Sequence, residues 1–200
     1  KLNSMFKENR EDFEAKWNDI KVFIEYGMLT DDKFYDRVSK SYMLTNTENK
    51  NFTLDEYKEK VKATQTDKND NLVYLYTNNV DEHDSLIDSA KAKGYDVLLM
   101  DSPLTPHLVA QLESKLEKTS FARIDSDTIE NLIAKDEEQP SKLTKEDEEK
   151  LQPIIEEVIS KQKFMVNFQS LSETDNPMQV TQAEFLRRMN EQQAMGGGGM

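Results

Sequence analysis

The residues best placed for catalysis or metal binding are two aspartates, Asp101 and Asp125. Each follows a short apolar run of strand-forming residues, so each would stand at the carboxyl end of a strand. Open parallel sheets bind their ligands at that edge, and two carboxylates there could hold Mg²⁺. Asp101 would then serve a flavodoxin-like small-ligand or signalling module. The alternative is that these acidic residues only end strands and cap helices, as turn sequences such as Asp101–Ser102–Pro103 do.

Other reactive patterns are missing from the sequence. The two histidines, His83 and His107, have no partner at metal-ligand spacing, and there is no HExxH, GxSxG, GxGxxG or GxxxxGK[ST] motif. The glycine run at 196–199 follows a helical pattern rather than a strand, which favours a flexible link. Without cysteine there is no disulfide, zinc finger or thiol nucleophile. We therefore expect no catalytic, metal or cofactor-binding residue in this chain.

Composition narrows the classes of partner. The 200 residues include 39 acidic and 26 basic side chains, a formal charge of −13, whereas a protein that coats nucleic acid needs a basic face. The longest apolar runs are far shorter than the roughly 20 residues of a membrane helix. The chain starts at Lys1 without an initiator methionine or a signal peptide. We expect a cytoplasmic piece of a longer protein that binds neither nucleic acid nor membrane.

The first part of the chain has helical periodicity. Apolar residues three, four or seven apart predict one amphipathic helix over 1–26, and its single tryptophan, Trp17, is assigned to the core. Gly27 is predicted to end that helix in the left-handed conformation. A second helix is predicted over 31–43.

A polar loop is predicted next, at 45–51, which contains no apolar residue. Thr53-Leu54-Asp55-Glu56 then forms a capping box, in which the threonine and glutamate side chains satisfy backbone N–H groups at a helix start. We therefore expect the first third to be entirely helical.

The pattern changes after Asp67 to strands alternating with helices. Strands are predicted at 71–77, 95–100 and 120–124, and helices at 83–93, from Thr105 onward, and at 126–133. Buried apolar strands alternating with helices predict a parallel sheet covered on both faces. We expect 68–134 to form a small three-layer α/β unit.

The last part begins with an acidic stretch around Pro140, predicted to be an exposed linker. Its acidic clusters at 136–138 and 146–149 could bind a basic partner, but such runs are more typical of a solvated linker. Beyond it, a helix is predicted from near Thr144, a strand at 164–168 and a helix over 182–195. Before and within that last helix lie several apolar residues, Met178, Val180, Phe185, Leu186 and Met189. Methionine-rich stripes adapt to irregular partners, although an ordinary buried face is the alternative.

Four segments carry a resemblance to a known family. They are Phe6–Phe13 with Trp17 and Phe23–Gly27, the strand Val73–Thr77, the strand Tyr95–Met100 that follows Gly94, and Pro177–Met189. In this order they resemble the 90-kDa heat-shock chaperones, in their bacterial form HtpG, over essentially the whole chain. The resemblance implies a mixed α/β fold: a helical coil, a small αβα sandwich with a short parallel sheet, and the start of an α+β C-terminal domain.

The resemblance also implies function and boundaries. The family is an ATP-dependent, homodimeric chaperone of unfolded client proteins, and its ATP and Mg²⁺ site and main dimer helices would lie outside 1–200. Residues 1–66 and 67–135 would belong to the middle domain, 136–143 would be the linker, and 144–200 would begin the C-terminal domain. By the same resemblance, the client-binding positions would be Met178, Phe185, Leu186 and Met189.

Overall fold

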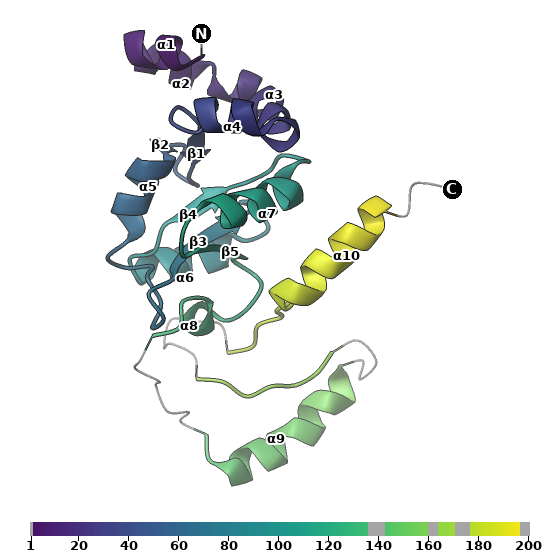
Figure 1. Cartoon of the computed structure of the whole chain (residues 1–200). Coiled ribbons are helices and arrows are strands. Elements are labelled where there is room, and N and C mark those ends of the chain that lie inside the picture. Colours follow the sequence, from purple (N-terminus) through teal and green to yellow (C-terminus); the bar gives the residue numbers. More distant parts are fainter. Residues whose placement is uncertain (1, 136–142, 160–163, 171–176, 197–200) are drawn as a thin grey trace. The chain divides into compact units, whose positions relative to one another are not determined.

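The computed structural model describes residues 2–135, 143–159, 164–170 and 177–196 (Figure 1). The chain divides into two compact units, one made of 1–134 with 180–200 and the other of 135–179. The predicted acidic cluster at 136–138, Pro140 and the glycines at 197–199 lie outside the described residues.

The helix predicted over 1–26 is three helices, α1 (Leu2–Glu8), α2 (Arg10–Ala15) and α3 (Trp17–Thr30). The first break is at Asn9, whose side-chain oxygen accepts from the Asp12 N–H at 3.1 Å. Such a cap starts a new helix because the side chain competes with the helical backbone for donors. Trp17 is buried, as predicted.

Gly27 does not end a helix. α3 continues to Thr30, and the glycine with positive φ is Gly94, at 75°. Gly27 instead admits an aromatic ring, because a Cβ atom there would lie 2.7 Å from a ring carbon of Phe34. Phe34 belongs to the next helix, α4 (Asp32–Val38), which is capped by Asp31.

The first third is not entirely helical. α4 stops at Val38, short of the predicted residue 43, and an antiparallel hairpin follows, β1 (Met43–Thr45) with β2 (Asn51–Thr53). The polar stretch predicted as a loop forms the hairpin's turn, where Asn49 takes a φ of 58°. The predicted capping box is present at the start of α5 (Leu54–Val61).

The predicted alternation of strands and helices is confirmed. Its elements are β3 (Leu72–Thr77), α6 (Asp84–Ala92), β4 (Val97–Leu99), α7 (Thr105–Lys115), β5 (Thr119–Arg123) and α8 (Ile129–Leu132). The strands are parallel, in the order β4-β3-β5. A mixed α/β fold with a small parallel sheet is thus the architecture of this part.

Side chains of β3 alternate between two cores. Tyr74 and Tyr76 pack with α7 and the N-terminal helices, whereas Val73 and Leu75 pack with α6 and α8. This alternation follows from the two-residue period of a strand. The sheet therefore has helices on both faces, and Figure 1 shows α7 and α6 on either side of it.

The second unit contains α9 (Lys145–Val158), which begins with a capping box between Thr144 and Asp147. The strand predicted at 164–168 is wrong: residues 164–170 form no regular element, and Met165 is almost fully exposed. A strand needs a partner for its backbone groups, and no described residue supplies one here.

The last helix, α10 (Glu184–Gly196), matches the helix predicted over 182–195. None of the helices in the described ranges is long and apolar enough to cross a membrane.

Candidate functional site

α10 lies against the α/β part of its own unit, beside β5. Two guanidinium nitrogens of Arg188 donate to the carboxylate of Glu113 on α7, at 2.7 and 3.0 Å. One of them also donates to the Phe121 carbonyl of β5 at 2.8 Å. The hydrogen bond with Glu113 is the main reason that the pKa of Arg188 lies above its ordinary value. Arg188 thus joins α10 to both α7 and β5.

Arg187 is the most buried side chain described on α10, with 4% of its surface exposed. It donates to the Tyr76 hydroxyl at 2.7 Å, and its guanidinium carbon lies 5.8 Å from that ring's centre. Glu184 and Glu191 of α10 also accept from it. Burial opposes its charge, but these hydrogen bonds outweigh burial and raise its pKa. For Tyr76, whose charged form is the deprotonated one, burial raises the pKa to about 12.

Three apolar side chains of α10 are turned away from this contact. Phe185 is 74% exposed, Leu186 49% and Met189 38%. Helices normally bury the apolar side and leave charges in water, so α10 is inverted. The four predicted client-binding residues, Met178, Phe185, Leu186 and Met189, are called the stripe below. Three of them therefore lie exposed on one helix. The fourth, Met178, is also exposed but belongs to the other unit.

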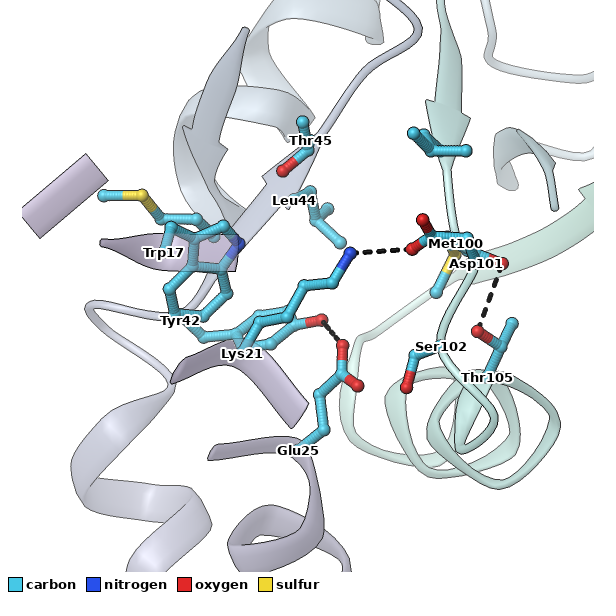
Figure 2. A pocket seen from close by; sticks show the side chains of 12 residues that line it. Trp17, Lys21, Glu25, Tyr42, Leu44, Thr45, Met100, Asp101, Ser102 and Thr105 are labelled. Carbon is cyan, nitrogen blue, oxygen red and sulfur yellow. Dashed lines mark hydrogen bonds and ion pairs between the residues drawn. The ribbon is translucent and has the colours of Figure 1, made fainter. Parts of the chain in front are cut away.

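Asp101 lines a cavity between α3, β1 and the segment that joins β4 to α7 (Figure 2). Its carboxylate accepts from the Lys21 ammonium group at 2.7 Å. In the same cavity the Tyr42 hydroxyl donates to the buried carboxyl of Glu25 at 3.3 Å, and Ser102 lies on its other side. Asp101 is therefore neutralised by a residue of the chain itself.

Asp125 is also paired within the chain. Two nitrogens of Arg123 donate to its oxygens at 2.6 and 2.7 Å, and His83 Nε2 lies 3.7 Å from it. Burial alone would raise the pKa of Asp125. The hydrogen bonds and charge of the Arg123 guanidinium lower it by more than burial raises it, so the pKa of Asp125 lies below its ordinary value.

The two histidines have different surroundings. His83 Nδ1 lies 2.7 Å from the Thr77 hydroxyl, within a buried cluster, whereas His107 is exposed. Among the described residues, no group of three or more acidic or histidine side chains is placed to hold a metal ion. Nothing in the described part of the chain favours a magnesium or signalling site at Asp101.

Sequence reasoning missed the charged residues that hold α10. Their spacing, Glu184-x-x-Arg187-Arg188-x-x-Glu191, places opposite charges three and four residues apart on one helix face. That signal predicts pairs within the helix. It does not predict Glu113 or Tyr76, which lie 75 and 111 residues away along the chain.

The chain matches known proteins over nearly its whole length. The model of the family "Hsp90 protein" matches residues 1–196. The chaperone protein HtpG of Bacteroides fragilis is 45% identical over 194 residues, and that of Porphyromonas gingivalis 44%. Each alignment covers 96% of this chain and 28% of the relative, so the chain spans little more than a quarter of these proteins.

A solved structure, the middle domain of a Plasmodium falciparum heat shock protein, aligns with a TM-score of 0.49 and 17% identity. The alignment covers 63% of this chain and 52% of that one.

Proposed function

Because the chain belongs to the Hsp90 protein family, we propose that it is a segment of an HtpG-type molecular chaperone, and that α10 supplies part of the surface that holds unfolded client proteins. The supporting observation is the inversion of α10. Arg187 is buried and Arg188 is partly buried, whereas Phe185, Leu186 and Met189 are open to solvent. Exposed apolar side chains grouped on one helix suit a partner that is itself apolar and irregular.

The size of this surface fits weak, unselective binding. Burying Phe185, Leu186 and Met189 against a client would contribute at most roughly 1.5–3 kcal/mol for each side chain, before the loss of entropy on association. The gain is smaller for Leu186 and Met189, which are only partly exposed to begin with. A total of several kcal/mol allows both capture and release of many different clients.

The other parts of the proposal concern the longer protein. We propose that the parent chaperone uses ATP and Mg²⁺ at a nucleotide site elsewhere in its length, acts as a homodimer through helices beyond Met200, and works in the cytoplasm. Family membership is the support for these statements. Within this chain we propose the middle domain over 1–66 and 67–135, a linker over 136–143, and the start of the C-terminal domain over 144–200.

The test is suppression of aggregation of a heat-unfolded protein, followed by light scattering. We compare the chain with a variant in which Met178, Phe185, Leu186 and Met189 are all changed to Ser. A matched control changes Phe23 and Tyr26 to Ser, because these residues of α3 are 74% and 62% exposed. Circular dichroism establishes that all three proteins are folded.

We expect the unmodified 200-residue chain and the α3 control to keep the client in solution, while the stripe variant loses this ability. If the stripe variant suppresses aggregation as well as the unmodified chain does, the stripe is not a client surface. Equal loss in the α3 control would show that any exposed apolar residue of the chain acts in the same way.

A further inference from the structure

β5 forms one edge of the small sheet. It pairs with β3 on its inner side, and within the described residues no strand pairs with its outer side. An open strand edge presents unpaired N–H and C=O groups, which can add a strand from another chain. Proteins avoid this by covering such an edge. The outer edge of β5 therefore needs a partner of some other kind.

Three side chains and one backbone N–H group take the place of that missing strand. The Phe121 N–H donates to Glu113 at 2.7 Å, and the Phe121 carbonyl accepts from Arg188 at 2.8 Å. Further along, the Arg123 N–H donates to Glu184 at 3.4 Å, and the Asp125 carbonyl accepts from the Gln182 N–H at 3.2 Å. Three of these four partners lie on α10 or on the residues just before it. α10 thus covers the outer edge of β5.

The attachment of this cover is electrostatic. Arg188 pairs with Glu113, and Glu191 lies 3.7 Å from Arg123. Arg187 contacts Tyr76 through its guanidinium group. Three apolar residues of the helix, Phe185, Leu186 and Met189, are exposed and add little to the attachment. When a helix held in this way leaves, the core residue that it uncovers is Tyr76, on which Arg187 lies.

We propose that α10 is a removable cover on the outer edge of β5, and that Arg187 and Arg188 are the positioning residues that hold it there with its apolar stripe facing solvent. The cover itself follows from the contacts. The role of the outward stripe rests on the proposed function, since that stripe is the surface offered to clients.

The test is hydrogen exchange of single backbone amides in the whole chain, measured by NMR. The reporter is the Arg123 amide, because its acceptor Glu184 is left unchanged in every variant. The reference is the Leu75 amide in the central strand. In the parent chain we expect Arg123 to exchange at least about tenfold faster than Leu75, since a cover opens without global unfolding. Equal rates would show that α10 leaves only when the whole unit unfolds, and would overturn the proposal.

The variants test whether charge holds the cover. Glu113→Arg and Arg188→Glu each place like charges across the contact. Loss of a charged hydrogen bond corresponds to about a tenfold or larger change in an equilibrium, so each should speed Arg123 exchange about tenfold while Leu75 stays unchanged. The double variant Glu113→Arg/Arg188→Glu restores an opposite pair, although Phe121 loses its bonds to Glu113 and Arg188. Arg123 should therefore exchange more slowly in the double variant than in either single variant. If the single variants leave Arg123 protected, or the double variant exchanges as fast as they do, the charge pair does not hold α10.

The two proposals can fail separately. Hydrogen exchange judges the cover and does not involve a client. Client retention by the stripe variant, in which Arg187, Arg188 and Glu113 are intact, judges the proposed function. Slow exchange in the charge variants together with lost retention in the stripe variant would overturn the cover alone, and the opposite pair of results would overturn the client surface alone.

Discussion

Glu25 shows how burial controls a single residue. Only 4% of its surface is exposed, and burial raises the pKa of its carboxyl group, although Ser102, Lys21 and Tyr42 partly oppose this. A carboxyl whose pKa is raised on folding favours the folded state most at low pH, below its unfolded value, and this contribution is lost as pH rises through the folded pKa. The ionised form of Glu25 therefore costs stability at neutral pH.

We expect Glu25→Gln to raise the free energy of unfolding at pH 8 relative to the parent, because the amide has no charge to desolvate. The difference should disappear near pH 4, where the parent carboxyl is protonated. Urea unfolding at the two pH values measures it. Glu11→Gln, which changes an exposed carboxylate on α2, is the control. A Glu25→Gln variant less stable than the parent at pH 8 would contradict this reading.

Gly27 is required by a close approach rather than by its backbone angle. A methyl group at this position would lie 2.7 Å from one ring carbon of Phe34 and 2.9 Å from another. Alanine is normally the better residue inside a helix, but overpacking typically costs about 1–3 kcal/mol. We expect Gly27→Ala to lower the free energy of unfolding by about 1–2 kcal/mol, measured in urea. The double variant Gly27→Ala/Phe34→Leu should recover part of the loss, and no recovery would mean that the ring is not the obstacle.

At the scale of elements, α5 is joined to the N-terminal helices by a charge pair at its first turn. Arg10 of α2 donates to both oxygens of Glu56, at 2.5 and 2.8 Å. Glu56 also completes the capping box with Thr53. These contacts lower the pKa of Glu56 to about 2, and the hydrogen bond with Arg10 contributes most. Both side chains remain about 40% exposed, so solvent screens much of the attraction.

We expect Glu56→Gln to lower the free energy of unfolding by about 0.5–1 kcal/mol at pH 7. A carboxylate with a lowered pKa stabilises the fold above its unfolded value of about 4.3 and loses this effect as pH falls towards 2. The gap between variant and parent should therefore close between pH 5 and about 2 in thermal or urea unfolding. Glu59→Gln, an exposed neighbour on the same helix, is the control, and a gap that persists at low pH would exclude the charge as its cause.

Element by element, the sequence predicts best where local chemistry and tertiary packing agree. Leu72–Thr77 and the Thr53 capping box are such places, since apolar strand formers and cap residues each have one favoured structure. The hairpin of β1 and β2 was missed because each strand has only three residues, too few to show a period of two. The strand predicted at 164–168 fails for the opposite reason. Its apolar run is clear, but a strand also needs a neighbour that no local pattern specifies.

For the whole molecule, sequence motifs distributed along the chain identified the family, and the strand–helix alternation gave the class of fold. The candidate site was only half predictable. Phe185, Leu186 and Met189 stood out by type and spacing, but the usual rule would bury them. Their exposure depends on Arg187 and Arg188 finding Tyr76 and Glu113. Those partners are distant in sequence, and only the folded sheet brings them together.

The cover on β5 also has a consequence in time. Arg188 and Phe121, which it joins, are 67 residues apart along the chain. At synthesis rates of about 5–20 residues per second, roughly 3–13 s separate the appearance of the strand from that of its cover. During this interval the edge of β5 has α7 beside it but no α10. Each newly made copy therefore presents that edge to other chains being made on the same messenger RNA. The speed of the ribosome, not the stability of the finished fold, sets how long this exposure lasts.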